Sequence, residues 1–489
     1  MAYEDEEDLN YDDYENEDEE YTQNHHKIII MMMMIMNTMM ITMMMIFMRW
    51  RLRMNKTLNQ KDIKVLGLSS LGGTLEFYDF IIFVFFANYI STNFFPKDLS
   101  SFWQMFNTYG IFAAGYLARP LGGVILAHFG DKFGRKRMFM ISILLMVIPT
   151  FTLAFIPNYE SIGFLCIVFL VFIRICQGIA IGGELPGAWV FVYEHAPQGQ
   201  KRTYLGILTA SVVGGILLGS LVFLIMNKIY TQEELHEWAW RIPFFLGGIF
   251  GIISAYLRKF LRETPVFEQM KKDKALEKFP LKEVFKKAKM GIVLSMMITW
   301  VLTGCIVVMI LLMPSYMAKI LQINTSIQTY LQIGGILLIC LGCIISGILA
   351  DKMGVIKSCV FFSVFFGIAS LLYFNTLYRQ NADFNLVACL YLLVCFFSGV
   401  MNFCPLIMSE VFDAKIKFSG LSFSYNIAYA IAGGLTPQLA FFLHSFALNN
   451  LSNFWRFSLG LYVFFLAIIA LLCAFIFSYL NNTQRTYSQ

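Results

Sequence analysis

The sequence predicts an all-α integral membrane protein, with twelve transmembrane helices in two pseudo-symmetric six-helix domains. Apolar residues make up 58% of the chain and charged residues 14%, against roughly 45–50% and 25% in soluble domains. Twelve apolar stretches follow Met54, and each approaches or exceeds the length of about 20 residues that a helix needs to cross a bilayer. The third observation is a repeated charged turn, Asp-Lys-Phe-Gly at 131–134 and Asp-Lys-Met-Gly at 351–354.

The two turns lie 220 residues apart (351 − 131), which is about half of the chain after Met54. Each turn follows one apolar stretch and precedes another, a pattern typical of secondary transporters built from two homologous membrane halves. The expected spans are 65–93, 103–128, 138–157, 161–191, 205–229, 239–261, 290–318, 327–350, 356–378, 384–411, 419–447 and 455–480. The longest polar segment between them is 262–289, so nothing after Met54 predicts a soluble catalytic domain.

Lysine and arginine gather in alternate turns, namely those after spans 2, 4, 6, 8 and 10. The other turns are poor in these residues. The positive-inside rule therefore predicts that the basic turns are cytoplasmic, which also leaves both ends of the twelve-span core inside. The net charge of +5 reflects this asymmetry, so it does not indicate nucleic-acid binding.

The expected domains are an acidic and Met-rich leader at 1–53, a six-helix domain at 54–262, a basic cytoplasmic linker at 263–289 and a second six-helix domain at 290–489. Residues 1–20 hold 12 of the 32 acidic residues, a composition typical of disordered segments. Residues 28–48 are almost all Met and Ile and are long enough to span. This run is either a thirteenth helix or part of a leader outside the functional chain, and its acidic flank disfavours a signal peptide.

The cysteines and histidines give no sign of a metal site. All ten cysteines lie in the expected spans or at their ends, where a buried thiol packs as a small hydrophobic side chain. The histidines lack the spacing of metal ligands. We therefore expect no cofactor and no enzyme, since an embedded enzyme needs a catalytic or metal constellation at one depth of the membrane.

Charged residues inside the expected spans are the candidates for chemistry, because such groups are costly in a bilayer and usually face a cavity or a partner. Glu76 and Asp79 share one helical face, and repulsion within this pair favours protonation of one carboxyl. Arg119, Arg174 and Glu184 are further intramembrane charges. Two interpretations stay open for the carboxyl pair: a proton carrier, or a static salt bridge that ties helices together. For Arg119, a packing or gating role is as plausible as ligand contact.

Glycines and prolines predict how the helices pack and bend. Gly178 and Gly182 have the spacing that lets two membrane helices approach closely. Prolines near the middle of a span open backbone groups or bend a helix. The prolines in question are Pro186, Pro314, Pro405 and Pro437.

Two of these segments carry a resemblance to a known family. Residues 130–137, Gly-Asp-Lys-Phe-Gly-Arg-Lys-Arg, resemble the loop between helices 2 and 3 of the major facilitator superfamily, and residues 174–178 resemble its helix-4 motif. Three further stretches, 76–80, 261–267 and 425–437, are similar to its metabolite:proton symporter family. The resemblance covers essentially all of 60–480.

This resemblance implies the major facilitator fold, alternating access, proton symport and a monomer in the bacterial plasma membrane. It implies that the gate of the cytoplasmic side is Asp131, Gly134 and Arg135, with Asp351 and Gly354 as a second copy. That copy has Val355 in place of arginine, so its latch should be weaker. The implied proton-coupling residues are Glu76 and Asp79, and the implied substrate-binding residues are Tyr78, Arg174, Gln177, Tyr425 and Asn426. Independently of the resemblance, the intramembrane charge Glu184 is a further candidate for proton coupling and the aromatic Trp189 for substrate binding.

The substrate is less constrained. A zwitterion needs a cation for its carboxylate and an aromatic face or a carboxylate for its ammonium. Arg174 with Tyr78, Trp189 or Asp79 could supply both. Spans 7–12 are expected to contain almost no buried lysine or arginine, apart from Lys319 near the end of a span, which favours a zwitterion or monocarboxylate such as proline or betaine. A di- or tricarboxylate such as α-ketoglutarate or citrate remains an alternative, as does a nutrient-sensing receptor that signals through residues 1–20. Sodium remains an alternative coupling ion.

Overall fold

The computed structural model describes residues 60–259, 261–275, 277, 279–379, 382–449 and 454–487. The leader at 1–53, its Met-rich run and the tail at 1–20 lie outside the described residues. Helices of the first half are α2 (Gln60–Phe85), α3 (Ala87–Phe94), α4 (Ser101–Phe133), α5 (Arg135–Leu153), α6 (Tyr159–Ile162), α7 (Leu165–His195), α8 (Lys201–Ile229), α9 (Gln232–Glu237), η1 (Ala239–Arg241) and α10 (Ile242–Arg258).

Two short helices, α11 (Pro265–Lys272) and α12 (Pro280–Lys287), occupy the polar segment between the halves. Helices of the second half are α13 (Lys289–Gly304), η2 (Cys305–Leu312), α14 (Met313–Leu321), α15 (Thr325–Met353), α16 (Val355–Leu377), α17 (Phe384–Phe397), η3 (Ser398–Asn402), α18 (Phe403–Val411), α19 (Lys417–Leu448), η4 (Phe454–Phe457) and α20 (Ser458–Tyr487). No strand occurs among the described residues.

The prediction of twelve membrane spans is confirmed, since twelve helical segments of the described residues are long and apolar enough to cross a bilayer. Some spans combine several elements, such as α13, η2 and α14 within Lys289–Leu321. The first expected span, 65–93, is interrupted at Phe86, where the backbone leaves helical geometry between α2 and α3.

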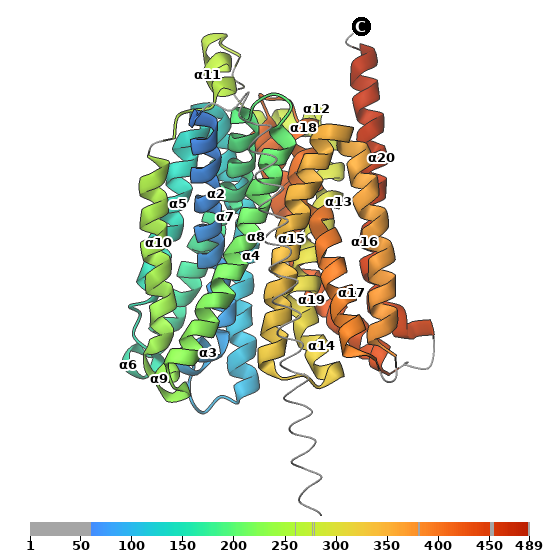
Figure 1. The fold of residues 1–489 in the computed structure, drawn as a ribbon. Coiled ribbons are helices and arrows are strands. Elements are labelled where there is room, and N and C mark those ends of the chain that lie inside the picture. The colour runs from blue at the N-terminus through green and yellow to red at the C-terminus, as the bar shows by residue number, and fades with distance from the viewer. Residues whose placement is uncertain are drawn as a thin grey trace, which may run out of the picture. The chain divides into compact units, whose positions relative to one another are not determined.

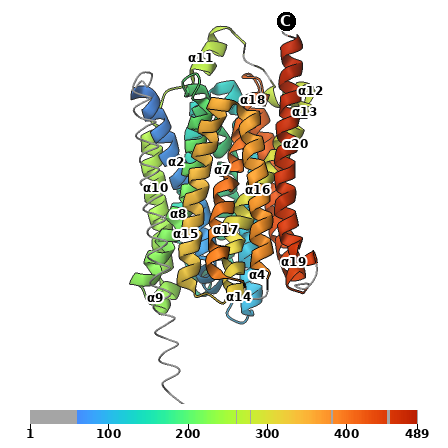
Figure 2. The same cartoon turned by 45° about the vertical axis from the view of Figure 1, so that its right-hand side comes forward.

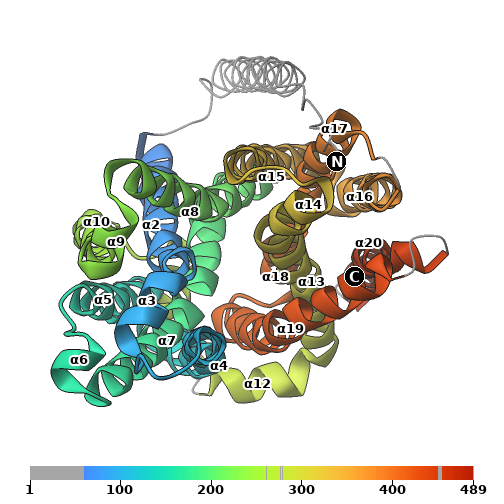
Figure 3. The ribbon, with the colours of Figure 1, turned by 90° about the horizontal axis from the view of Figure 1, so that it is seen from below.

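Helices of the first half, blue to green, form one group, and helices of the second half, yellow to red, form another (Figures 1 and 3). The groups meet along two seams, where α8 packs against α15 and α4 packs against α19. Figure 2 shows α8 beside α15 and, on the right, α19 and α20. Any site between the two halves must therefore be built from these four helices and their neighbours.

Two of the four prolines coincide with breaks in regular α-helix. The π-helical segment η2 precedes Pro314, and the 3-10 segment η3 precedes Pro405. Proline has no N–H and its ring crowds the carbonyl four residues earlier, so the preceding turn must change its hydrogen bonding. Pro186 and Pro437 instead lie inside the continuous helices α7 and α19.

The close approach predicted for Gly178 and Gly182 is confirmed between α7 and α4. A Cβ atom at Gly178 would overlap the backbone of Gly115, and one at Gly182 would overlap the carbonyl of Arg119. The backbones are therefore in direct contact, and this contact fixes the height of Arg119 relative to α7.

The turns between α4 and α5, α7 and α8, α15 and α16, and α18 and α19 lie on one face together with α11 and α12, at the top of Figure 1. We call this the basic-turn face. The end of α20 lies on the same face (Figure 1). In the α4–α5 and α15–α16 turns, Gly134 and Gly354 have φ values of 118° and 91°, a region that side chains disfavour.

Candidate functional site

Arg119 of α4 lies at the junction between the two halves. Its Nε donates to Oδ1 of Asn426 on α19 at 3.4 Å, and its side chain is buried. The guanidinium carbon lies 4.0 Å from the ring centre of Tyr429, 5.4 Å from that of Tyr425 and 5.7 Å from that of Tyr116. A buried cation therefore sits in a box of three tyrosines, one from the first half and two from the second.

Trp189 of α7 extends this aromatic cluster. Its ring lies edge-on to Tyr425, with 4.9 Å between ring centres, and its indole N–H has no hydrogen-bond partner among the described residues. Trp189, Thr209, Tyr425 and Tyr429 line an apolar cavity of about 10 Å³ between the halves. Such a volume holds about one water molecule, so the junction is closed here to any larger molecule.

Arg174 lies in a second aromatic cage. Its guanidinium carbon is 4.5–4.8 Å from the ring centres of Phe80, Phe83 and Phe112. Nη1 donates to Oε1 of Gln177 at 2.7 Å, and the Gln177 amide donates in turn to Thr150 at 2.8 Å. Its guanidinium makes no ion pair with a described carboxylate.

Asp79 is 1% exposed, and neither carboxyl oxygen has a hydrogen-bond partner among the described residues. It lies against Gly247 of α10, where an added Cβ would meet the carboxyl oxygen. Tyr78 points elsewhere, since its hydroxyl donates to the carbonyl of Pro243 at 2.9 Å. Glu76 belongs to α2, but its side chain lies outside the described residues.

Glu184 has a different environment from Asp79. Its carboxylate pairs with Arg258 of α10 and accepts from the hydroxyl of Ser142 on α5. These contacts join three helices of the first half. In this state Glu184 therefore acts as a structural tie, while its predicted role in proton coupling stays a prediction.

On the basic-turn face, Asp131 of α4 binds the first turn of α19 in the other half. Its Oδ2 accepts from the backbone N–H of Ser419 at 2.9 Å and from its hydroxyl at 2.8 Å. Arg135 pairs with Glu194 at 3.0 Å and donates to the carbonyl of Ala414 at 2.9 Å. We call the contact between Asp131 and Ser419 the first clasp.

The second copy of the turn makes an equivalent contact with the two halves exchanged, so that the aspartate belongs to the second half and the donor to the first. Asp351 of α15 accepts from the backbone N–H of Thr203 at 2.8 Å and from its hydroxyl at 2.6 Å. We call this contact the second clasp. Val355 occupies the position in this turn that Arg135 has in the first. The nearby carboxylate Glu410 of α18 instead pairs with a cation of the other half, Arg202 of α8, at 2.9 Å. The weaker latch expected from Val355 stays a prediction.

The linker contributes to the first turn. Glu263 accepts from the backbone N–H of Lys136 with both carboxyl oxygens at 3.2 Å. A carboxylate here satisfies a free donor of the first turn of α5 and complements the positive end of its dipole. The linker is thereby attached to the turn that carries the first clasp.

Sequence reasoning missed several of these contacts. Tyr429 follows Tyr425 by one helical turn, so it could have been placed on the same face. Thr203 and Ser419 lie 216 residues apart, close to the repeat of the charged turns, which is a usable signal. Tyr116 and Thr150 carry no signal in the sequence that separates them from other polar groups in the spans.

Comparison with known proteins agrees with this architecture. Residues 28–437 match the family model described as Major Facilitator Superfamily, and residues 1–29 match one described as highly acidic protein. The chain is 32% identical over 409 residues to the proline/betaine transporter of Salmonella typhimurium, covering 78% of this chain and 77% of that protein. It is 29% identical over 413 residues to the alpha-ketoglutarate permease of Escherichia coli, covering 83% and 91%.

Solved structures with the same fold include the proton:xylose symporter bound to 6-bromo-6-deoxy-D-glucose. The TM-score is 0.70 at 17% identity, covering 85% of this chain and 94% of that one. A partially occluded inward-open structure of the Escherichia coli xylose transporter gives a TM-score of 0.61 at 16% identity, covering 85% and 97%. At this identity the likeness concerns the fold alone.

Proposed function

Because this chain belongs to the Major Facilitator Superfamily and its relatives are metabolite transporters rather than enzymes, we propose that it carries a small polar metabolite by proton-coupled symport. The proposed substrate is a zwitterion or monocarboxylate such as proline or betaine. The proposed location is the bacterial plasma membrane, with the basic-turn face in the cytoplasm, as the positive-inside rule requires.

The observation that carries this proposal is Arg119 within its box of tyrosines at the junction of the halves. A guanidinium is a strong partner for a carboxylate, and tyrosine faces attract quaternary ammonium groups. When the halves separate, a zwitterion can bind Arg119 through its carboxylate and the vacated tyrosine faces through its ammonium. The relative named proline/betaine transporter supports this substrate class.

A second candidate, a dicarboxylate, is favoured by the position of Arg174. Both Arg174 and Arg119 are buried. Arg119 contacts Tyr116, and the ring of Tyr116 packs edge-on against Phe112 of the cage around Arg174. Two cations linked by neighbouring rings would suit two carboxylates at the ends of a short chain. The relative named alpha-ketoglutarate permease supports this alternative.

The proposed proton carrier is Asp79. A buried carboxylate without a hydrogen bond or a cation is far less stable than the neutral acid. The closed state therefore favours protonated Asp79, and a movement of α2 or α10 that admits water favours release of the proton. Coupling follows if substrate binding and protonation both favour closure.

Alternating access in this proposal uses the two seams and the two clasps. In the closed state the cavity around Trp189 is too small for the solute, and in this proposal the clasps hold the basic-turn face shut. Opening toward the cytoplasm breaks both clasps and parts α4 from α19. The solute then leaves down the path between the halves.

The test is uptake by vesicles that contain the full chain. The panel is labelled proline, glycine betaine, α-ketoglutarate, citrate and shikimate, each with an imposed proton gradient, an imposed sodium gradient or neither. We expect proline or betaine to accumulate with the proton gradient. Accumulation of α-ketoglutarate would favour the second candidate, and accumulation that follows only sodium would refute proton coupling. Equal uptake under all three conditions would refute symport altogether.

A further inference from the structure

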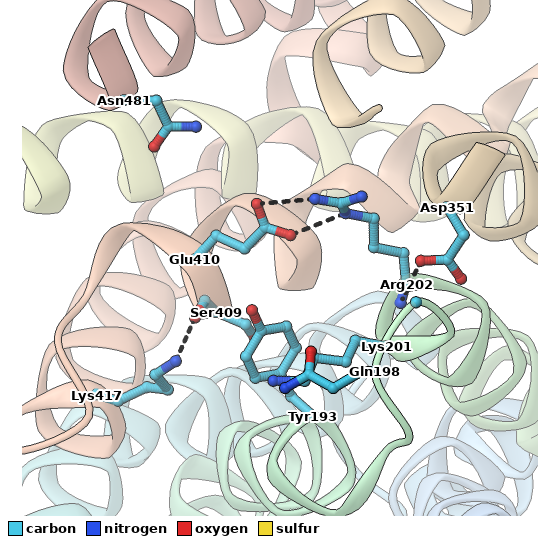
Figure 4. A pocket seen from close by; sticks show the side chains of 10 residues that line it. Tyr193, Gln198, Lys201, Arg202, Asp351, Ser409, Glu410, Lys417 and Asn481 are labelled. Atoms are coloured by element: carbon cyan, nitrogen blue, oxygen red, sulfur yellow. Dashed lines mark hydrogen bonds and ion pairs between the residues drawn. The ribbon is translucent and has the colours of Figure 1, made fainter. Parts of the chain in front are cut away.

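A polar cavity of about 370 Å³ lies on the basic-turn face between the two halves. Its walls include Tyr193, Lys201, Arg202, Ser409, Glu410 and Lys417 (Figure 4). It is distinct from the closed junction around Trp189, with which it shares no lining residue. At Gln198 and Gly199 its wall is exposed to solvent, so a solute in the adjoining water can reach it.

The charges of this cavity are not balanced. Its two carboxylates are already engaged: Glu410 pairs with Arg202, and Asp351 accepts from Thr203 and from the backbone of Arg202. Lys201 and Lys417 have no carboxylate within ion-pair distance among the described residues. Figure 4 shows Lys417 bonded to Ser409 and Arg202 bonded to Glu410.

The two lysines are held near one another by a single ring. The ammonium nitrogens of Lys201 and Lys417 lie 4.8 and 4.5 Å from the ring centre of Tyr193. Lys417 is 8% exposed and donates to the carbonyl of Ser409 at 2.6 Å. An ammonium group has three donors, so Lys417 retains protons for another acceptor.

Ser409 provides the second sign of a ligand. Its side chain is fully buried, and its hydroxyl has no hydrogen-bond partner among the described residues. A buried hydroxyl usually finds a partner. Lys201 and Lys417 are also the first residues of α8 and α19, whose positive dipole ends favour an anion.

We propose that this cavity is a second binding site, which takes a phosphate-type oxyanion between Lys201 of the first half and Lys417 of the second. A tetrahedral oxyanion offers several acceptors and no need for a donor, which fits two ammonium groups and a hydroxyl. Because its ligands come from both halves, the anion binds the closed basic-turn face more tightly than the open one and stabilises it. The anion is either a free phosphate compound of the adjoining solution or the headgroup of an anionic lipid.

The test measures thermal unfolding of the purified full chain in an uncharged detergent, with inorganic phosphate titrated against chloride at constant ionic strength. We expect phosphate to raise the melting temperature of the wild type. In Lys201→Gln the half-maximal phosphate concentration should rise about tenfold, the effect of losing one charge-assisted contact. Lys415→Gln is the matched control, because Lys415 is exposed and does not line the cavity, and it should behave as the wild type.

A second arm separates the two sources of phosphate. The same variants are reconstituted in phosphatidylcholine vesicles with and without phosphatidylglycerol. Stabilisation by phosphatidylglycerol that is lost in Lys201→Gln and kept in Lys415→Gln, without an effect of free phosphate, identifies the lipid as the source. Equal stabilisation of the wild type and Lys201→Gln by either ligand, or no stabilisation by both, would overturn the proposal. Neither arm depends on transport, so the proposed function is tested separately.

Discussion

The buried charged residues of the first half are of two kinds, those in an ion pair and those without one. Arg135 and Arg258 are in ion pairs within their half and therefore hold helices together. Arg174 and Asp79 have no such partner among the described residues. Arg119 is likewise buried and contacts the neutral Asn426 rather than a described carboxylate. A charge that lacks an ion-pair partner in the closed state gains one only when water or a solute arrives, so these three are the side chains whose state can change during transport.

We predict that Asp79→Asn abolishes proton-driven accumulation while substrate binding persists. Asparagine keeps the size of the side chain but cannot exchange a proton, so substrate should only equilibrate across the membrane. The measurement is the ratio of inside to outside substrate under an imposed pH gradient, with binding measured separately by calorimetry. Asp98→Asn, on an exposed loop, is the control. A wild-type ratio in Asp79→Asn would contradict the prediction.

We also predict that Arg119→Lys weakens substrate binding by roughly tenfold or more. Lysine keeps the charge but loses the planar group that stacks on the tyrosines and binds a carboxylate with two N–H groups. The dissociation constant from calorimetry gives the result. Lys132→Arg, the reverse exchange at an exposed position outside the site, should change it little. An unchanged constant in Arg119→Lys would place the substrate elsewhere.

For single residues, the sequence predicted which charges are buried but not which residues they contact. Buried charges inside apolar spans were visible in the sequence because each is unusual there, and Asp79, Arg119 and Arg174 were all identified as candidates. Their partners were not visible. The contact between Arg119 and Asn426 joins residues 307 positions apart, and only the packing of α4 on α19 determines it.

Among whole elements, the pair of α4 and α7 is the most closely packed part of the first half that bears on the site. Gly178 and Gly182 let the two backbones touch, and α4 then presents Arg119 to α19. Hydropathy predicted these helices because burial in lipid demands apolar residues along their length. It did not predict η2 or the break at Phe86, because those depend on how neighbouring helices satisfy the freed backbone groups.

We predict that Gly178→Ala destabilises the protein by about 1–3 kcal/mol, the range for an overpacked contact. The added methyl group would overlap the backbone of Gly115, which cannot rotate away as a side chain can. Gly214→Ala is the matched control, since a Cβ at this helical glycine meets nothing within 4 Å. The measurement is the melting temperature in detergent. Equal melting temperatures of the two variants would show that α4 and α7 can move apart at little cost.

On the scale of the whole molecule, the two clasps are related by the internal repeat. The carboxylate of each half bonds the first turn of a helix in the other half, Ser419 in one case and Thr203 in the other. The repeat of the charged turn therefore placed Asp131 and Asp351 at equivalent positions in the two halves, while their role as a gate stays a prediction. It did not predict that each aspartate bonds a residue of the opposite half, because the residues around the aspartate do not indicate which distant donor will pack against it.

We predict that Thr203→Val shifts the protein toward the state open at the basic-turn face. The variant removes the hydroxyl donor to Asp351, and a hydrogen bond to a charged group contributes roughly 1.5–3 kcal/mol. The open-to-closed ratio should therefore rise about tenfold or more. Distances between spin labels on the two halves report this ratio. Thr152→Val, at an exposed threonine of α5, should leave it unchanged, and an unchanged ratio in Thr203→Val would show that the hydroxyl does not hold the gate.

The exchange of partners between the clasps also constrains how the two halves can evolve. A change at position 203 in one half alters the energy of Asp351 in the other, and a change at 419 alters that of Asp131. The two halves are therefore coupled at these positions, although each carries its own copy of the charged turn. A chimera that joins one half of this chain to the complementary half of a relative should therefore close properly only where the relative supplies a hydroxyl and an aspartate at the matching positions.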